Sequence, residues 1–305
     1  MLPEYADIES QGEEGRTVKK RKLVVLGCTG MIGHTLFRKI SGDPRYQVIG
    51  TTRSLEGTSA DFTPEMRRNI RTGVNLSDFS TIEHLLVREA PDTVINCIGI
   101  TKQQKDASPL AFIETNTALP HRVAEVCART GARMVQMSTD CVFSGSKGNY
   151  DESDVSDAVD LYGRTKFLGE VTQGHCLTIR TSLIGRELGS QLGLLEWFLG
   201  QKGETKGFTK AIFSGLTTNE LAKVFIAHIL PDESLTGLYH ISSLPLSKFD
   251  LITLVARIFK KEITIHPSEE LRIDRSLDGS KFASETGYAA PPWTEMIEEM
   301  RADVF

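Results

Sequence analysis

The chain of 305 residues carries 35 Lys and Arg against 40 Asp and Glu, so its formal net charge is −5 at pH 7. This acidic balance argues against a nucleic-acid-binding protein, and 40% hydrophobic with 25% charged residues excludes a mainly disordered chain. The longest uncharged stretch, 23–37, contains three glycines and is too short to cross a bilayer, so we expect no transmembrane helix and no membrane partner.

Residues 1–20 are predicted to form a flexible tail, because their first part is acidic and lacks the apolar centre of a secretory signal. The chain contains five cysteines: Cys28, Cys97, Cys127, Cys141 and Cys176. They are odd in number, widely spread and without metal-ligand spacing. We therefore expect reduced thiols in a cytoplasmic protein and no metal site.

Short apolar blocks alternate with amphipathic helical patterns over the first 183 residues. Strands are predicted at 23–26, 47–51, 93–97, 133–137 and 176–180. Helices, with apolar residues spaced i, i+3 and i+4, are predicted at 36–40, 81–88, 109–129 and 161–170. This alternation predicts an α/β fold with a doubly wound parallel sheet, a Rossmann domain over residues 21–183.

Beyond residue 183 the pattern changes to glycine-rich loops and shorter elements. These are expected at 192–199, 219–230, 238–242 and 251–259. A return segment near 217–243 is predicted to complete the sheet, whereas 184–216 and 244–305 form a smaller, interleaved substrate-binding region that includes a lid. Trp197 and Phe198 lie at leucine-rich spacing and are expected in the core.

The segment 27–33 (GCTGMIG) follows the first strand and opens a helix, as a dinucleotide-binding loop does. Its glycines permit a tight turn and let backbone N–H groups approach a pyrophosphate, which the helix N-terminus favours. Arg53 follows the second strand, where NAD enzymes tend to carry an acidic residue for the ribose 2′-hydroxyl. A guanidinium suits a 2′-phosphate, so NADP(H) is favoured over NAD(H). The alternatives are a glycine turn without a ligand and a surface arginine.

Tyr162 and Lys166 are separated by four positions in a predicted helix and therefore share one face. A nearby ammonium brings a tyrosine closer to working pH as a general acid or base. The strand at 133–137 runs directly into Ser138-Thr139-Asp140, and open α/β sheets bind ligands at strand carboxyl ends. Thr139 could thus hydrogen-bond to the carbonyl oxygen that Tyr162 protonates. The alternative for 138–140 is a turn or a helix cap.

The glycine loop, the Ser-Thr-Asp turn and Tyr-x-x-x-Lys, in this order, resemble the extended short-chain dehydrogenase/reductase family, and Asn116 fits its pattern. More narrowly, STDCVF (138–143), LYGRTK (161–166) and IRTS (179–182) are similar to dTDP-4-dehydrorhamnose reductases, which are sugar-nucleotide 4-ketoreductases. RSLD (275–278) with Lys281 and Phe282 resembles their closing motif. The resemblance covers nearly the whole chain from Lys22.

The resemblance implies that Tyr162 donates the proton, that Lys166 holds the nicotinamide ribose and acidifies Tyr162, and that Thr139 orients the keto oxygen. The residues implied along the cofactor are Gly27, Thr29, Gly30, Met31, Ile32, Arg53, Cys97, Ile98, Gly99, Tyr162 and Lys166. The candidate substrate-binding residues are Lys102, Thr139, Asp140, Arg186, Phe208 and Lys210. For Arg186 and for the loop 207–215, lid packing and surface charge are the alternative.

Two segments depart from the reductase pattern. CIGITKQQ (97–104) stands where the reductases usually carry an alanine-rich stretch, and Cys141 replaces a tyrosine. Enzymes that both epimerise and reduce 4-keto sugar nucleotides carry a cysteine two residues after the catalytic Ser or Thr, which Thr139-x-Cys141 matches. A thiolate at Cys141 could remove a proton next to the C4 ketone. A small buried cysteine is the alternative.

Taken together, the residues and the resemblance predict NADPH-dependent reduction of the C4 ketone of a nucleotide-linked 4-keto-6-deoxyhexose, for polysaccharide precursor synthesis in the cytoplasm. The expected partners are a sugar-nucleotide substrate and a second copy in a homodimer. Two alternatives stay open. One is a bifunctional 3,5-epimerase/4-reductase using Cys141. The other is a non-catalytic NADP-binding regulatory subunit, since a reductase-like chain serves methionine adenosyltransferase in that way.

Overall fold

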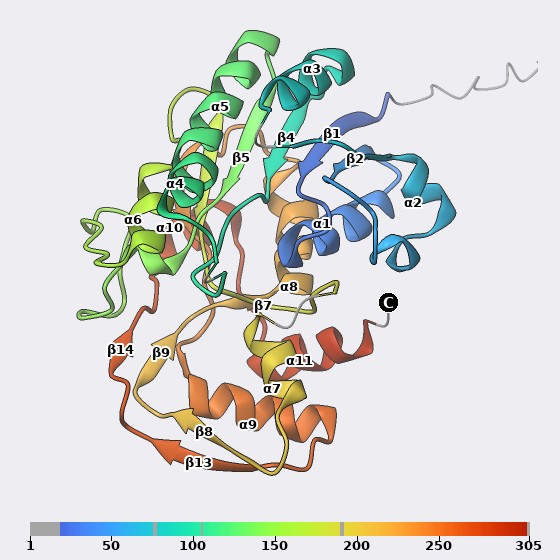
Figure 1. Ribbon diagram of the computed structural model, residues 1–305. Helices are drawn as coiled ribbons and strands as arrows, with labels where there is room; N and C mark the ends of the chain where they lie inside the picture. Colours follow the sequence, from blue (N-terminus) through green and yellow to red (C-terminus); the bar gives the residue numbers. More distant parts are fainter. Residues whose placement is uncertain (1–18, 76–77, 105, 190–191, 304–305) are drawn as a thin grey trace, which may run out of the picture.

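The computed structural model describes residues 19–75, 78–104, 106–189 and 192–303. Among these residues, a seven-stranded sheet with strand order β11-β6-β5-β4-β1-β2-β3 forms the centre of the molecule (Figure 1). Every neighbouring pair in this sheet is parallel. Its strands are β1 Arg21–Leu26, β2 Tyr46–Thr51, β3 Ile70–Arg71, β4 Thr93–Asn96, β5 Arg133–Met137, β6 Cys176–Arg180 and β11 Gly237–His240. The predicted α/β Rossmann fold is confirmed, and the winding reverses between β1 and β4.

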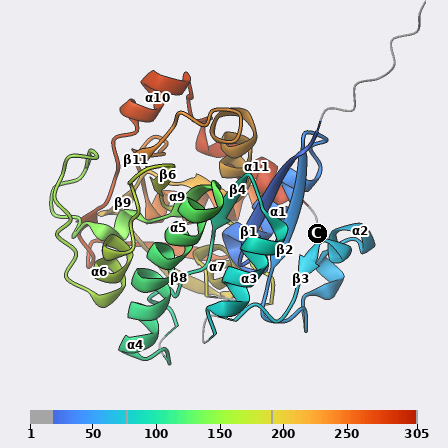
Figure 2. The ribbon, with the colours of Figure 1, turned by 90° about the horizontal axis from the view of Figure 1, so that it is seen from above.

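Both faces of the sheet are covered, which explains why its strands are apolar throughout. Along β1, Leu23 and Val25 point into one core and Val24 and Leu26 into the other, because side chains alternate along a strand. The first core also takes residues from α1 Met31–Ser41, α8 Thr218–Val224 and α11 Trp293–Ala302. The second core takes residues from α3 Ser80–Glu89 and α5 Leu119–Thr130 (Figure 2).

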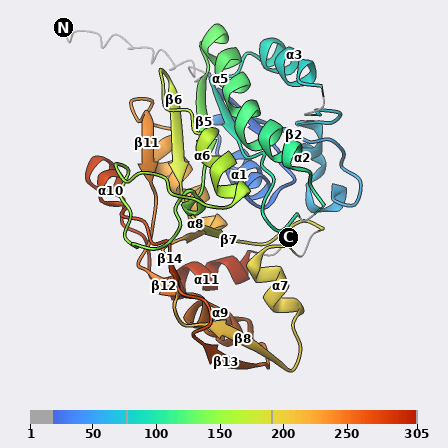
Figure 3. The same cartoon turned by 60° about the vertical axis from the view of Figure 1, so that its left-hand side comes forward.

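A second region lies beyond the carboxyl ends of the central strands, in the lower part of Figures 1 and 3. It contains the short strands β7 Leu183–Ile184, β8 Glu204–Phe208, β9 Ala211–Phe213, β10 Leu216–Thr217, β12 Leu246–Ser247, β13 Thr264–Ser268 and β14 Ile273–Asp274. Its helices include α7 Leu194–Gly200 and α9 Lys248–Phe259. The chain crosses between the two regions several times. After β7 to β10, β11 returns to the central sheet and pairs with β6, and the chain then continues into β12 to β14. The division at residues 183 and 184 stays a prediction.

The predicted helix at 109–129 is interrupted. The structure has α4 Pro109–Phe112, a π-helical turn at Ile113–Ala118, and then α5. Pro120 has no N–H to donate to the carbonyl of Asn116, four residues earlier, so regular α-helical bonding cannot continue there. Turns of this kind often mark functional sites, and this one carries Asn116. The element predicted at 219–230 likewise ends in a π-helical turn, Phe225–Ile229.

Several local expectations need correction. Trp197 was expected in the core but is 40% exposed, whereas its neighbour Phe198 is buried, because consecutive helical residues point about 100° apart. The helix predicted at 161–170 ends at Leu168, as α6 Leu161–Leu168. The chain also contains α2 Pro64–Arg68 and α10 Ser280–Thr286, which the patterns did not predict.

Three further expectations concern the cysteines, membrane-spanning helices with metal sites, and the N-terminal tail. All five cysteines are free. In the described ranges, no helix combines the length and the apolar character needed to span a bilayer, and no cluster of His, Cys, Asp and Glu is arranged to hold a metal ion. Of the predicted tail, residues 1–18 lie outside the described part of the chain, and residues 19 and 20 directly precede β1.

Candidate functional site

The glycine loop lies between β1 and α1 at the carboxyl edge of the sheet. Gly27 has a φ of +79°, which only glycine adopts without strain. A Cβ at Gly33 would lie 2.1 Å from the Gly27 carbonyl oxygen, so the loop folds tightly onto the helix. No side chain among the described residues caps α1, whose N-cap is Gly30. The first N–H groups of α1 are therefore available to an anion.

The loop after β4 packs against the glycine loop. A Cβ at Gly27 would lie 2.9 Å from Ile98 Cγ1, and a Cβ at Gly99 would lie 3.9 Å from Lys166 Nζ. Cys97 lies close enough to Lys166 for the ammonium to lower its thiol pKa slightly, although burial raises that pKa to about 12. The fold thus brings the predicted cofactor residues after β4 next to those after β1.

Arg53 lies just past the end of β2, and its neighbour Thr52 contacts the loop through a hydroxyl–hydroxyl hydrogen bond to Thr29 (3.1 Å). The Arg53 side chain is exposed. Within the described part of the chain its guanidinium has no hydrogen bond or ion pair. It is therefore free to meet a group bound along the loop.

Helix α6 holds Tyr162 and Lys166 against the end of β5. The Asp160 side chain accepts a hydrogen bond from the Gly163 amide (2.7 Å) and caps the helix. A Cβ at Gly163 would lie 2.2 Å from the Cys141 carbonyl oxygen. This close approach seats α6 directly on the Asp140–Val142 turn, and it brings the Tyr162 phenol close enough to the Thr139 hydroxyl to influence the pKa of the phenol.

Two hydrogen bonds fix the Thr139 hydroxyl. It donates to Asp140 Oδ1 (3.1 Å) and accepts from the Cys141 amide (3.1 Å). Burial raises the pKa of Tyr162 above its ordinary value, and the nearby Cys141 and Asp140 act in the same direction. Tyr162 is therefore a protonated phenol at neutral pH, as a proton donor must be.

Lys166 is buried, and its ammonium donates a hydrogen bond to the Met137 carbonyl (2.6 Å). Burial lowers its pKa to about 8, although Glu170 acts in the opposite direction. In these contacts Lys166 does not lower the pKa of Tyr162, so the acidification inferred from the sequence stays a prediction. Asn116 supports the neighbouring loop through reciprocal hydrogen bonds with the Ile100 N–H and C=O (2.9 Å each).

Cys141 lies beside this cluster, and burial raises the pKa of its thiol to about 11. Arg275 Nη1 donates a hydrogen bond to the sulfur (3.3 Å), and Arg275 and Lys102 lower the thiol pKa only in part. Cys141 is therefore a neutral thiol at pH 7, which does not favour the thiolate base that the epimerase hypothesis requires.

Sequence reasoning missed two features. Lys248, the first residue of α9, interacts electrostatically with Asp140 and Cys141 from more than 100 positions away in the chain. Glu170 accepts two hydrogen bonds from Arg180 (2.8 Å each) and one from Ser138 (2.6 Å). That buried network ties α6 to β5 and β6. Glu170 follows Lys166 of the Tyr-x-x-x-Lys motif by four positions, so the sequence could have indicated that Glu170 lies near the motif. No local pattern pointed to Lys248.

The other predicted substrate residues are more scattered. Lys102 is exposed in the loop after β4 but close enough to Cys141 to affect its pKa. Arg186 forms an ion pair with Glu196 of α7 (2.8 Å). Lys210 is exposed, 4.0 Å from Glu269, and Phe208 is half-buried at the end of β8. Their role in substrate binding stays a prediction.

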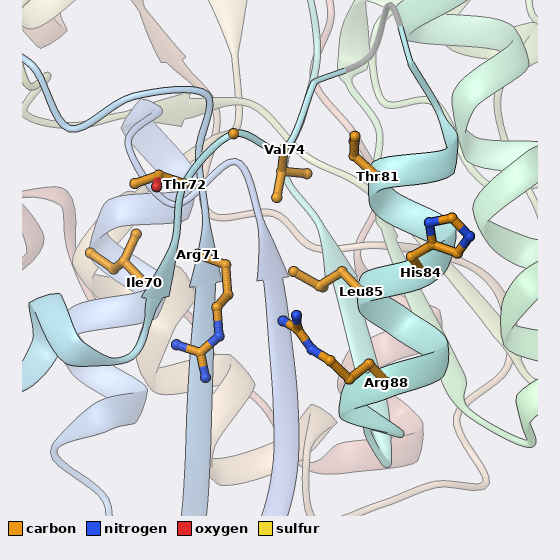
Figure 4. Close-up of a pocket in the computed structure, with 9 residues that line it drawn as sticks. Ile70, Arg71, Thr72, Val74, Thr81, His84, Leu85 and Arg88 are labelled. Carbon is orange, nitrogen blue, oxygen red and sulfur yellow. The ribbon is translucent and has the colours of Figure 1, made fainter.

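A separate surface pocket opens between β3 and α3 (Figure 4). Arg71 and Arg88 in its lining both donate to Glu89 Oε1 (3.2 and 3.1 Å). None of the predicted site residues lines this pocket. The catalytic candidates thus lie elsewhere, at the carboxyl edge of the sheet.

Comparison with known proteins is consistent with this geometry. The family model described as RmlD substrate binding domain matches residues 21–304. The beta subunit of methionine adenosyltransferase 2 from Rattus norvegicus is 26% identical over 160 residues, 52% of this chain and 44% of that protein. The match therefore spans less than half of that relative. A dTDP-4-keto-6-deoxy-D-glucose reductase from Streptomyces niveus is 29% identical over 151 residues, 48% of this chain and 45% of that protein.

Among solved structures, dTDP-4-dehydrorhamnose reductase from Bacillus anthracis str. Ames in complex with NADP superimposes with a TM-score of 0.77. The two chains are 19% identical, and the alignment covers 94% of this chain and 100% of the other. At that identity the likeness establishes the shared fold.

Proposed function

The chain belongs to the RmlD substrate-binding domain family, and from this premise we propose that it is an NADPH-dependent reductase of the C4 ketone of a nucleotide-linked 4-keto-6-deoxyhexose. The observation that carries the proposal is the cluster of Thr139, Tyr162 and Lys166 at the carboxyl end of β5, beside the glycine loop. We further propose that it acts in the cytoplasm on polysaccharide precursors, and that it forms a homodimer.

The glycine loop fits a dinucleotide for two reasons. A Cβ at Gly27 or Gly33 would clash with neighbouring atoms, so only glycine lets the loop fold this tightly. Among the described residues, no side chain caps the first N–H groups of α1, which can therefore bind a phosphate. The dinucleotide would supply the hydride. Backbone amides of Thr29, Met31 and Ile32 would hold its pyrophosphate, because the other amides of 27–32 donate hydrogen bonds within the protein. Arg53 would hold a 2′-phosphate, which favours NADPH over NADH. Cys97, Ile98 and Gly99 would line the nicotinamide half, with Lys166 on its ribose.

Tyr162 would donate its phenolic proton to the C4 oxygen. Thr139 would hold the same oxygen by turning its hydroxyl proton from Asp140 Oδ1 to that oxygen, while the Cys141 amide keeps donating to the hydroxyl. Asp140 is buried beside Thr139 and contacts the sugar. Lys166, anchored on the Met137 carbonyl, keeps positive charge near the phenolate that forms.

Two other functions remain as alternatives. The beta subunit of methionine adenosyltransferase 2 among the relatives favours a regulatory, non-catalytic chain, whereas the proximity of the Tyr162 phenol to the Thr139 hydroxyl favours catalysis. Solvent-exchange epimerisation by Cys141 is disfavoured by its raised thiol pKa.

The test mixes the purified protein with NADPH and a panel of 4-keto-6-deoxy sugar nucleotides prepared beforehand in ordinary water. The reaction is run in deuterated water, and NADPH absorbance and product mass are followed. NADPH oxidation with one sugar and no carbon-bound deuterium supports the reductase. Deuterium at C3 or C5 that a Cys141→Ser variant and a protein-free control both lack supports the epimerase. NADPH binding without oxidation of any sugar supports the regulatory alternative.

A further inference from the structure

The ammonium of Lys248 lies over the Phe213 ring, within electrostatic reach of Asp140 and Cys141. The side chain is partly buried, and its Nζ lies 3.6 Å from the centroid of the Phe213 ring. Over the residues that the structure describes, the ammonium has no hydrogen bond and no ion pair. Ser247 caps α9 by accepting a hydrogen bond from the Asp250 amide (3.0 Å), which holds Lys248 in the first turn of that helix. A cation in such a place gains stability from an anion that reaches it.

Two further cations lie around the same space. The Arg275 amide donates to the Ile212 carbonyl (3.0 Å), one residue before the Phe213 ring that Lys248 contacts, and both Arg275 and Lys102 are close enough to Lys248 to repel its charge. Arg275 is oriented by its bonds to the Phe143 carbonyl (2.8 Å) and the Cys141 sulfur (3.3 Å). Opposing these three cations are the Asp140 carboxylate, which Thr139 engages, and Asp160, whose nearest oxygen is 3.9 Å from Arg275 Nη2.

The groups that face Lys248 come from four parts of the chain. Asp140 and Cys141 follow β5, Lys102 follows β4, Phe213 belongs to β9, and Arg275 follows β14. Burial lowers the pKa of Lys248 to about 8, although Asp140 and Cys141 raise it. An anion bound between the cations would offset this cost of burial.

We infer that Lys248, together with Arg275 and Lys102, forms a subsite for an anionic oxygen group of the substrate, immediately beside Thr139 and Cys141. The inference rests on the proposed function, because it places the substrate where Thr139 can hold its keto oxygen. Two parts of a sugar nucleotide have this chemistry. One is the diphosphate that links the sugar to the nucleoside, which the proposed 6-deoxyhexose substrate carries. The other is a carboxylate on the sugar ring, which would make the substrate a uronic acid in place of the 6-deoxyhexose.

The experiment measures binding by calorimetry to the full chain with its dinucleotide site saturated by NADP⁺. The probes are UDP and dTDP, UDP-glucose and dTDP-glucose, whose sugars are uncharged, and UDP-glucuronate. Lys248→Met removes the charge and keeps an unbranched side chain against Phe213. Lys248→Arg restores the charge. Lys206→Met is the matched control, because Lys206 is an exposed lysine on β8 that forms an ion pair with Glu270 (2.8 Å).

Lys248→Met should weaken binding about 10- to 100-fold, the loss of one charge-assisted contact. Lys248→Arg should recover most of the affinity, and Lys206→Met should bind as the wild type does. If the subsite takes the diphosphate, all nucleotides lose affinity together. If it takes a ring carboxylate, the loss is confined to UDP-glucuronate. Unchanged affinity for every probe in Lys248→Met, or no rescue by Lys248→Arg, would overturn the inference.

A second measurement separates this inference from the proposed reaction. With NADP⁺ bound, inorganic pyrophosphate and free glucuronate are tested for a rise in melting temperature at low ionic strength. Stabilisation of the wild type by either anion, lost in Lys248→Met, supports the subsite even if no keto sugar is reduced. Reduction of a keto sugar with unchanged KM in Lys248→Met, and no anion stabilisation in either protein, refutes the subsite and leaves the reductase standing.

Discussion

At the scale of single residues, Thr139 and Tyr162 are important because the proposed reaction has both hydroxyl groups contact the same keto oxygen of the substrate. Their hydroxyl groups lie close to each other, so a carbonyl oxygen between them can meet the Tyr162 proton on one side and, once the Thr139 hydroxyl turns away from Asp140 Oδ1, the Thr139 proton on the other. Burial keeps Tyr162 protonated, and Lys166 is held nearby on a backbone carbonyl. The chemistry thus depends on the phenolic proton more than on the bulk of the ring.

Replacing Tyr162 by Phe removes that proton and leaves the ring. We expect the turnover rate with the keto sugar nucleotide to fall by about 10²- to 10⁴-fold, whereas NADPH affinity stays nearly constant. Steady-state kinetics and a separate NADPH titration measure the two quantities. A variant with near-wild-type turnover would show that Tyr162 is not the donor.

Arg53 is the residue on which the cofactor preference depends. Its guanidinium is exposed at the end of β2, next to the glycine loop, and has no hydrogen bond or ion pair to any residue that the structure describes. Arg53→Asp should weaken NADPH binding about tenfold or more and improve NADH binding, because a carboxylate repels a 2′-phosphate and accepts from a 2′-hydroxyl. The ratio of kcat/KM for the two cofactors is the readout. An unchanged ratio would make Arg53 a surface residue.

At the scale of elements, the position of α6 decides whether the Tyr-x-x-x-Lys pair reaches the end of β5. Two glycines allow this helix to lie directly on backbone. A Cβ at Gly163 would lie 2.2 Å from the Cys141 carbonyl oxygen, and one at Gly169 would lie 1.8 Å from the Asn116 carbonyl oxygen. The Asn116 carbonyl belongs to the π-helical turn that precedes Pro120. Gly169 therefore lets the end of α6 lie directly against that turn.

Gly163→Ala should therefore push α6 away from the Asp140–Val142 turn. We expect a loss of roughly 1–3 kcal/mol in the free energy of unfolding and a fall in turnover larger than the change in NADPH affinity. Urea unfolding and kinetics check both. Gly42→Ala serves as control, since its Cβ would meet nothing closer than the Lys39 carbonyl oxygen at 3.4 Å. Equal behaviour of the two variants would contradict this account.

At the scale of the whole molecule, buried histidines link stability to pH. Burial lowers the pKa of His34 and of His240 from 6.5 to about 4. His34 lies in α1, and the His240 ring is hydrogen-bonded to the Tyr150 carbonyl (3.0 Å). In the unfolded chain both titrate near 6.5, so between pH 6.5 and 4 the unfolded state binds more protons than the folded state.

We therefore expect the free energy of unfolding to fall as the pH drops from about 6.5 toward 4, with no contribution from these histidines above that window. Urea midpoints across this range measure the slope. His240→Gln should reduce it, whereas His84→Gln, at an exposed position of α3, should not. A slope that is the same in the wild type and in His240→Gln would exclude this histidine as its source.

The sequence by itself determined the features that depend on neighbouring residues. The alternation of apolar blocks with amphipathic segments predicted the α/β Rossmann fold, the strand-glycine-helix context predicted the loop after β1, and four-residue spacing placed Tyr162 and Lys166 on one helical face. Each of these follows from the local geometry of strands and helices, so no knowledge of distant contacts was needed.

The tertiary structure decided what depends on which parts of the chain come together. Folding places Lys248 and Arg275 beside Cys141, leaves Trp197 exposed, and brings β11 back beside β6. It also raises the pKa of Cys141 and of Tyr162 by burial. Burial and electrostatic environment are set by residues remote in the chain. For that reason the chemical state of the site could be read only from the folded molecule.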